Sequence, residues 1–259
     1  MPGQIKTAEE IKIIREGGKR LAAILDEVLG HAKPGITTAE LDQLAETLII
    51  KTGGVPSFKN YRSRESEPPF PSTICASVNQ QLVHTPASDY KLQAGDILTI
   101  DIGMRYPAVG GLYTDMAKTI GIGTISPAAQ KLLDVTAQSL TRAIAAAKPG
   151  GEIADISRAV QTFVEQHGFS VVRQLVGHGV GYAVHEEPRV PNFVTSKSPT
   201  VKLVEGMVLA IEPMVNIGDP VVTTLDDGWT IATADGSLCA HFEHTIAITK
   251  KGATVLTQR

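Results

Sequence analysis

This chain of 259 residues has little cysteine and no long hydrophobic run. Its two cysteines, Cys75 and Cys239, lie far apart without a CxxC spacing, which argues against a disulfide framework and fits a reducing compartment. No segment approaches the roughly 20 consecutive apolar residues of a membrane span, and the polar N-terminus lacks the apolar core of a secretory signal. We therefore expect a cytoplasmic protein.

An excess of positive charge is also missing. The formal net charge is −3 and no long basic run occurs, so the chain offers no field suited to a nucleic-acid backbone. Charged residues make up 20% and apolar residues 42% of the chain, as in ordinary soluble globular proteins. The length suffices for one large domain or two small ones with a sizeable core.

Helices and strands are predicted in an order that occurs twice. Thr7 to Glu10 forms a capping box before the first helix, Thr38 is expected to cap the second, and Ser126-Pro127 begins the third. The four predicted helices cover residues 7–33, 38–53, 126–148 and 153–168. The predicted strands cover residues 73–78, 97–104, 112–122, 170–174, 206–216, 229–232 and 239–249.

Each half of the chain reads helix, Lys-Pro-Gly, helix, glycine stop, strands. Residues 95–101 resemble residues 206–212, and each segment ends in a carboxylate. We interpret this as a duplicated α+β unit, with halves at 5–123 and 124–256 in one domain. The two sheets are expected to face each other across a pseudo-two-fold axis, with the acidic residues at the seam.

Four carboxylates interrupt strand patterns that otherwise read as buried: Asp101, Asp115, Glu212 and Glu243. An unpaired charge in such a place costs several kcal/mol. Neutralisation by Arg or Lys is the structural alternative, yet few basic residues occur within these strands. The pattern therefore favours divalent metal ions as the neutralising charges.

The segment 177–188 supplies two histidines to this arrangement. Glycines at 177, 179 and 181 allow a sharp bend around His178, and His185 follows seven residues later. A strand alternates faces, so a bend or bulge is needed before both histidines can face one cavity. A glycine-rich hairpin with two surface histidines is the alternative interpretation of this segment.

Together the four carboxylates and His178 provide more ligands than one tetrahedral zinc requires. They suit two divalent ions that lie about 3.5–4 Å apart and share bridging carboxylates. Oxygen-rich ligation with one imidazole favours Mn, Fe or Co, and Zn stays open because metal availability can decide. His84 and His185 would remain free to contact a substrate.

These residues resemble the type I methionine aminopeptidases, the pita-bread metallopeptidases. Each matching motif is weak alone, but their order and spacing over nearly the whole chain are specific. The motifs lie at 74–79, 83–84, 95–101, 114–119, 177–181, 185–188, 211–214, 227–230 and 242–245.

The resemblance implies a role for each site residue. Asp101 would bind one metal, Asp115 and Glu243 would bridge both, and His178 and Glu212 would complete the second site. A metal-bridging water would attack the carbonyl of an N-terminal methionine. Glu212 would move its proton, while His185 would contact the carbonyl oxygen and His84 the scissile amide nitrogen.

By the same resemblance, the methionine pocket is lined by Tyr61, Phe70, Cys75 and Trp229, for each of which core packing is the alternative. A thioether gains from contact with aromatic rings. Several positions depart from the family pattern: the polar loop 62–69, Thr85-Pro86 after His84, the lengthened hairpin 105–111, and Val184 before His185. They leave the selectivity for methionine open.

The predicted function is removal of the initiator methionine from nascent chains when the second residue is small. The alternatives are an Xaa-Pro aminopeptidase of the same fold and a catalytically silent pita-bread binding protein. The silent protein would be expected to lack ligands, and here all five positions are occupied. We expect a monomer whose partners are N-terminal methionine peptides, with the ribosome as a further candidate.

Overall fold

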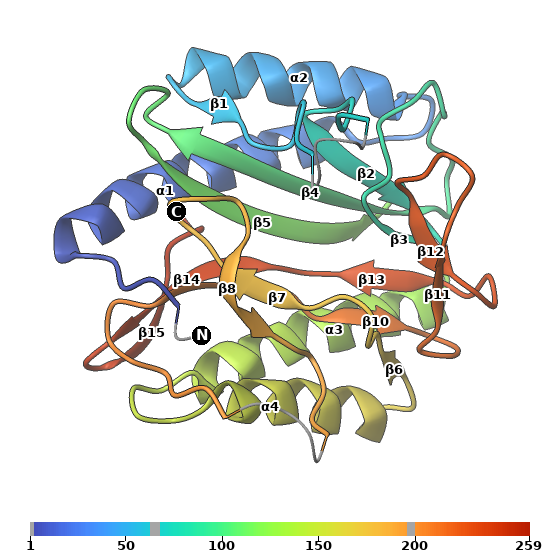
Figure 1. The fold of residues 1–259 in the computed structure, drawn as a ribbon. Coiled ribbons are helices and arrows are strands. Elements are labelled where there is room, and N and C mark those ends of the chain that lie inside the picture. Colours follow the sequence, from blue (N-terminus) through green and yellow to red (C-terminus); the bar gives the residue numbers. More distant parts are fainter. Residues whose placement is uncertain (1–2, 63–67, 196–199) are drawn as a thin grey trace.

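The computed structural model describes residues 3–62, 68–195 and 200–259. Its four helices are α1 (Ala8–His31), α2 (Thr38–Lys51), α3 (Pro127–Ala146) and α4 (Ile153–Gln166) (Figure 1). The strands of the first half are β1 (Val55–Pro56), β2 (Ile74–Val78), β3 (Gln81–Val83), β4 (Ile97–Tyr106) and β5 (Leu112–Gly121). Those of the second half are β6 (Ser170–Val171), β7 (Gly177–Gly179), β8 (Glu186–Val190), β9 (Val208–Ile211), β10 (Met214–Asn216), β11 (Val222–Thr224), β12 (Ile231–Thr233), β13 (Cys239–His241), β14 (His244–Thr249) and β15 (Gly252–Val255).

The paired strands are all antiparallel. β4 lies at the centre of the first half, where β2 and β5 flank it and β1 pairs with its end. In the second half the order β15-β14-β9-β7-β8 forms one sheet, and β13-β10-β6 forms another. β11 and β12 join β3 of the first half in a third, so this small sheet crosses from one half to the other.

Each pair of helices covers its own strands with a separate apolar core. α1 and α2 bury Leu21 and Leu41 against Ile100 of β4. α3 and α4 bury Leu132 and Val160 against the strands of the second half. Hydrophobic burial of this kind is the main favourable contribution to folding, so each half contains most of its own stabilising core.

The two halves meet where β5 runs beside β13 and β14. Here the Thr119 hydroxyl donates to the His241 carbonyl at 2.8 Å and accepts from the His241 N–H at 3.0 Å. In the same way the Thr245 hydroxyl donates to the Asp115 carbonyl at 2.7 Å and accepts from its N–H at 3.0 Å. We call these contacts the threonine seam; they join β5 to β13 and β14 through threonine side chains.

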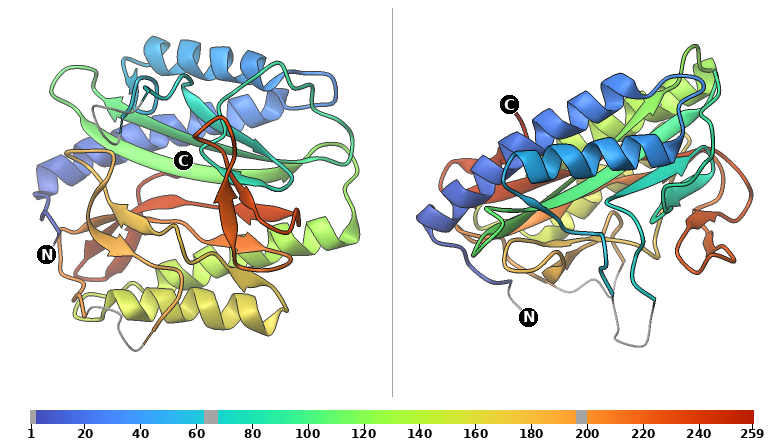
Figure 2. Two further views of the ribbon diagram at one scale, coloured as in Figure 1. Left: turned by 45° about the vertical axis from the view of Figure 1, so that its right-hand side comes forward. Right: turned by 90° about the horizontal axis from the view of Figure 1, so that it is seen from above.

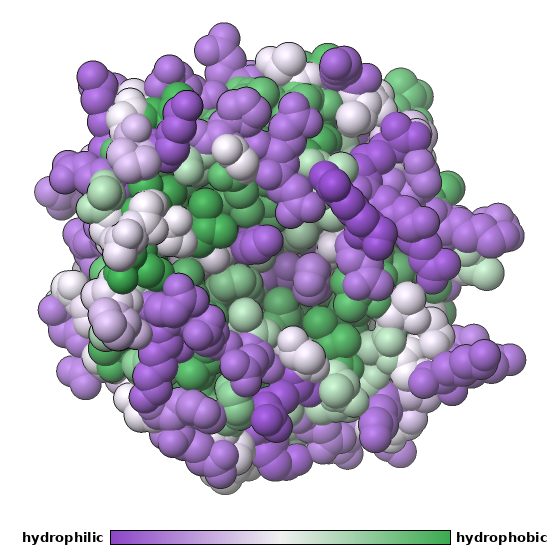
Figure 3. Space-filling model, turned by 180° about the vertical axis from the view of Figure 1, so that it is seen from behind, coloured by the Kyte–Doolittle hydropathy of each residue, from purple (hydrophilic) through white to green (hydrophobic). Residues whose placement is uncertain are grey.

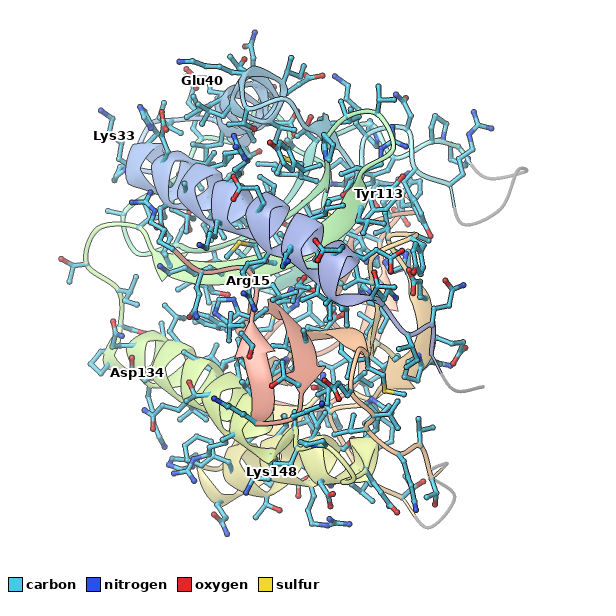
Figure 4. All side chains as sticks on the ribbon, turned by 90° about the vertical axis from the view of Figure 1, so that its left-hand side faces the viewer. Arg15, Lys33, Glu40, Tyr113, Asp134 and Lys148 are labelled. Atoms are coloured by element: carbon cyan, nitrogen blue, oxygen red, sulfur yellow. The ribbon has the colours of Figure 1, made fainter. Side chains whose placement is uncertain are left out.

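Views from other sides show how the molecule is layered. Seen from above, α1 and α3 lie on one side of the strands, and β7, β8 and the β11–β12 hairpin lie on the other (Figure 2). The face seen from behind carries hydrophilic side chains around a central group of apolar ones (Figure 3). Arg15, Lys33, Glu40, Asp134 and Lys148 all belong to the helical side and its edges (Figure 4).

The predicted helices are confirmed within a few residues at each end. The capping box at Thr7 is present, and Ser126 caps α3. The predicted cap of α2 is wrong by one residue: Thr37 is the N-cap, and Thr38 is the first helical residue. None of the helices in the described ranges has the length and apolarity needed to cross a bilayer.

Two predicted strands are wrong as continuous elements. The segment 206–216 divides into β9 and β10 at Glu212-Pro213, and 239–249 divides into β13 and β14 at Phe242-Glu243. Proline has no backbone N–H, so a sheet ladder cannot continue through residue 213. The predicted strand 170–174 shortens to two residues, and the β7–β8 hairpin occupies the glycine-rich segment.

Candidate active site

A cavity of about 260 Å³ opens where the two halves meet. All eleven residues singled out in the sequence line it: Tyr61, Phe70, Cys75, His84, Asp101, Asp115, His178, His185, Glu212, Trp229 and Glu243. They come from both halves and from segments up to 182 residues apart, from Tyr61 to Glu243. Only the assembled fold therefore creates this site.

The four carboxylates reach the cavity from two kinds of backbone. Asp101 and Asp115 lie within the continuous β4–β5 ladder, where Asp101 is opposite Ala117. Glu212 and Glu243 lie at the two strand breaks of the second half. All four are buried, with between 2% and 9% of the residue exposed.

Burial makes it difficult for these groups to ionise. It raises the pKa of Asp101 to about 7. It also raises the pKa values of Asp115, Glu212 and Glu243 well above their usual range, and neighbouring carboxylates add to the shift. The four groups cannot all be negative at neutral pH unless a positive charge lies among them.

A metal ion supplies this positive charge better than a protein side chain does. Asp101 Oδ1, Asp115 Oδ1 and Glu243 Oε1 are buried oxygens without a hydrogen-bond partner, and the described residues that line the cavity include no Lys or Arg. Ligand atoms of Asp115, His178 and Glu243 lie within 4.8 Å of one another. Oxygen and imidazole donors at this spacing suit a divalent ion.

The ring of His178 is oriented for ligation. Its Nδ1 lies 2.9 Å from the carbonyl oxygen of Gly179, which can only accept, so Nδ1 carries the proton. The lone pair of Nε2 is thus free, and Nε2 lies 3.4 Å from Glu212 Oε1. Burial lowers the pKa of His178 to about 3, so the imidazole is neutral and this contact is not an ion pair. A backbone carbonyl behind a ligating histidine is a common way to fix its tautomer.

His185 and His84 lie beside this cluster. The Tyr61 hydroxyl lies 2.9 Å from His185 Nδ1, and the rings of His178 and His185 are 4.5 Å apart at a steep angle. His84 has a backbone φ of 59°, which is uncommon for a residue with a side chain. Burial lowers the pKa of His84 to about 4, so its ring is neutral as well. The predicted bend between His178 and His185 is confirmed, because the chain turns between the antiparallel strands β7 and β8 and both histidines line the cavity.

Part of the cavity wall is apolar. Phe70 and Trp229 meet edge to face with ring centroids 5.2 Å apart, and Phe58, Cys75 and Val184 pack with them. Burial raises the pKa of the Cys75 thiol well above its usual range, so this cysteine is a neutral, apolar contact. A cluster of this kind accommodates a flexible hydrophobic side chain.

Six lining residues were not found from the sequence: Phe58, Val83, Leu175, Val176, Met214 and His241. His241 is the most polar of them. It is 1% exposed, and its Nε2 lies 3.6 Å from Glu212 Oε2. Neither ring nitrogen has a hydrogen-bond partner among the residues that the structure describes. Its position two residues before Glu243 was an available signal, since alternate residues of a strand share a face.

Comparisons of the sequence and the fold with known proteins show the family of this chain. A family model, Metallopeptidase family M24, matches residues 12–250. The chain belongs to this family. Methionine aminopeptidase 1 of Bacillus subtilis is 49% identical over 254 residues, which are 98% of both chains. Methionine aminopeptidase of Clostridium perfringens is 46% identical over 98% of both chains.

Solved structures give the same family. The crystal structure of methionine aminopeptidase from Thermotoga maritima has a TM-score of 0.93 and 41% identity, over the full length of both chains. The resemblance seen in the sequence and the α+β pita-bread fold are therefore confirmed. The Xaa-Pro dipeptidase from Bacillus anthracis shares the fold at a TM-score of 0.76 and 21% identity, but this chain covers only 62% of its length. As an M24 metallopeptidase, the chain is a hydrolase that depends on divalent metal.

Proposed function

We propose that this chain removes the N-terminal methionine from nascent proteins and peptides whose second residue is small. One observation carries the proposal: a single cavity joins the buried carboxylate cluster to an apolar pocket built around Phe70, Cys75 and Trp229. The first part suits hydrolysis, and the second suits a methionine side chain. Relatives that match over nearly the full length and carry the name methionine aminopeptidase support it.

In this proposal two divalent ions bind the five-ligand cluster. Asp101 would hold one ion, Asp115 and Glu243 would be ligands shared by both, and His178 and Glu212 would hold the second; Mn, Fe, Co and Zn are the candidates. When bound, such a pair polarises the peptide carbonyl and lowers the pKa of water, which removes the need for a serine or cysteine nucleophile.

Protein side chains then handle the protons. The Glu212 carboxylate accepts the proton of the attacking water and delivers it to the leaving amine. When the Tyr61 hydroxyl donates to His185 Nδ1, the ring proton lies on Nε2, which donates to the scissile carbonyl oxygen as charge develops there. His84 contacts the scissile amide nitrogen.

Selectivity follows from the buried apolar residues of the cavity wall. Phe70 is 4% exposed and Cys75 4%, so a bound methionine side chain would lose most of its contact with water there. Tyr61 and Trp229 complete the wall of the proposed pocket.

The proposal also covers the domain organisation, oligomeric state, location and partners of the chain. We propose that residues 1–259 act as one catalytic domain with halves at 5–123 and 124–256, as a monomer in the cytoplasm. Its partners are peptides that begin with methionine, and the ribosome is a candidate docking partner. The Xaa-Pro alternative is less favoured, because the Xaa-Pro dipeptidase matches at 21% identity against 49% for a methionine aminopeptidase.

A peptide assay tests the function. Purified protein with Mn²⁺ or Co²⁺ is expected to release methionine from Met-Ala-Ser and from Met-Gly-Met-Met, and to leave a peptide with a large second residue intact. Metal analysis of protein purified without added ions measures how many ions are bound. Cleavage of Xaa-Pro peptides alone would move the assignment to the alternative.

A further inference from the structure

The turn that carries His185 is held by a buried ion pair outside the cavity. Lys6, next to the first helix, contacts Glu186 Oε2 through its ammonium group. The two side chains are 1% and 5% exposed. Glu186 directly follows His185 in the chain, and neither Lys6 nor Glu186 lines the cavity.

Glu186 also closes the turn itself. Its Oε1 accepts the backbone N–H of Tyr182 at 2.5 Å and that of Ala183 at 3.0 Å. One carboxylate therefore ties both ends of the 182–186 segment together, and hydrogen bonds to a charged acceptor are stronger than neutral ones.

The N-terminal segment is itself anchored, so Lys6 is a fixed point. Its backbone N–H donates to Gly206 at 2.8 Å, and its ammonium also donates to the Gln4 carbonyl at 3.2 Å. The ammonium lies 4.9 Å above the Tyr182 ring, and the Tyr182 hydroxyl donates to Glu10 at 2.8 Å. Gly181 leaves room for Lys6, since a Cβ there would lie 2.7 Å from Lys6 Cε.

Stability alone is a weak reason for such a pair. Two charges lose hydration when they are buried, and replacement of a buried ion pair by apolar groups is often neutral or stabilising. The contacts are instead directed at one short turn, and the side chain on that turn that faces the cavity is His185.

We propose that Lys6 and Glu186 are a positioning pair, which fixes the 181–186 turn so that His185 meets the scissile carbonyl. The inference rests on the proposed function, because His185 is its catalytic hydrogen-bond donor. Lys6 and Glu186 touch no reacting atom and act through His185.

The test uses the double variant Lys6→Met/Glu186→Gln. Glutamine keeps a carbonyl oxygen for the Tyr182 and Ala183 N–H groups, and methionine fills the space of the lysine stem. The change therefore removes both charges and the hydrogen bonds that the ammonium donates to Glu186 and Gln4. The expected result is a kcat lower by roughly tenfold with KM within about twofold, since small misplacements of a catalytic group cost rate more than binding. Lys12→Met is the matched control: its exposed pair with Glu9 lies away from the turn, and kcat is expected to be unchanged.

A double-mutant cycle separates positioning from general damage. In a His185→Ala background the same two substitutions are expected to cause no further loss of kcat, because the residue they position is gone. Side-chain ¹H–¹⁵N spectra of the metal-free protein give a readout that is independent of activity. The His185 signals are expected to shift in the double variant, while those of His167, the residue that caps the C-terminus of α4, stay in place.

Two results would overturn the inference: wild-type kcat with unshifted His185 signals, or an equal loss of kcat with and without His185. If the double variant does not fold, Glu186→Gln alone serves instead, and it is expected to shift the same signals. It keeps a carbonyl oxygen for the Tyr182 and Ala183 N–H groups and replaces the oxygen that accepts from Lys6 with an NH2 group. A wild-type protein that releases no methionine would instead contradict the proposed function, and the spectra would still decide whether the pair positions His185.

Discussion

The two halves of this molecule present the same kind of residue to one cavity on different backbones. In the first half, Asp101 and Asp115 stand on two ten-residue strands that pair without interruption. In the second half, Glu212 and Glu243 stand where strands stop. A continuous ladder fixes a carboxylate through many backbone hydrogen bonds, whereas a break needs separate support.

That support is visible around the two glutamates. The Asn192 side chain donates to the Glu212 carbonyl at 2.9 Å, and the Glu243 N–H donates to Ala117 of the opposite half at 2.9 Å. Glutamate also has one more methylene group than aspartate, so its carboxylate reaches further from the backbone. The comparison indicates that the second half adapts to the first, whose strands supply the rigid frame.

The largest expected effect comes from removal of a bridging carboxylate in either half. Asp115→Asn and Glu243→Gln keep size and shape but lose the charge, so each should reduce metal content and lower kcat by about a thousandfold or more. Methionine release and metal analysis measure both. Equal turnover and metal content in wild type and Glu243→Gln would refute the bridging role.

The same two variants also sharpen the comparison. Burial disfavours the charged form of both carboxyl groups, and a neutral amide avoids this cost. The metal-free forms of Asp115→Asn and Glu243→Gln are therefore expected to melt at or above the wild-type temperature. A lower melting temperature for Glu243→Gln alone would mean that the carboxylate itself supports the break.

A tenfold effect is expected from the support of the broken strand. Asn192→Ala removes the side-chain donor to Glu212 and should weaken metal affinity by roughly 10-fold, as outer partners of ligands commonly do. Thr99→Val is the control in the first half. It removes the side-chain hydrogen bond between Thr99 and Thr119, but the backbone ladder between β4 and β5 still holds Asp101 in place. Its metal affinity should change by less than about twofold. Calorimetric titration measures the metal affinity of both variants. Equal losses of affinity would contradict the proposed difference in support between the two halves.

A smaller effect, on stability, is expected at the threonine seam. Thr245→Val keeps the shape but leaves the Asp115 N–H and carbonyl without partners, which should cost about 1–3 kcal/mol in unfolding free energy. Thr141→Val, on the exposed face of α3, should stay within about 0.5 kcal/mol. Denaturant titration with matched metal content distinguishes them.

The sequence predicted the regular parts of this fold better than its breaks. Caps at Thr7 and Ser126 and the period of apolar residues determine helices locally, so α1 and α3 were found. The breaks at Glu212 and Glu243 were missed, because apolar runs continue through both and only Pro213 marked one of them. Where a strand ends there depends on contacts with the other half.

The candidate site was predicted from charged residues within apolar strand patterns. Asp101 is conspicuous between isoleucines, and the structure places it with the other proposed ligands in one cavity. His241 was missed, since a histidine before an aromatic residue carries no such contrast. Lys6 was missed for a different reason: its partner is 180 residues away, and only the fold brings them together.

The smallest expected effect is the share of Asp101 in the pH dependence of the stability of the metal-free protein. The carboxyl group of Asp101 and the neighbouring histidines change this stability in opposite directions. Folded Asp101 keeps its proton up to about pH 7, whereas the unfolded residue releases it near pH 4, so unfolding releases a proton and stability falls as pH rises between these values. The buried histidines oppose this. The pKa values of His178 and His241 are lowered to about 3, so unfolding takes up protons until about pH 6.5.

Above pH 6.5 only the carboxyl groups still contribute, and the metal-free protein should lose up to about 1.4 kcal/mol per pH unit for each group that remains protonated in the folded state. Asp101→Asn should make the fall between pH 6.5 and 7 shallower, because its share of the released protons is gone. Added Mn²⁺ should abolish the fall, since the ions then carry the counter-charge. Chemical denaturation at several pH values measures it. A stability that rises over this interval would mean that the carboxyl groups are already ionised in the folded, metal-free cavity.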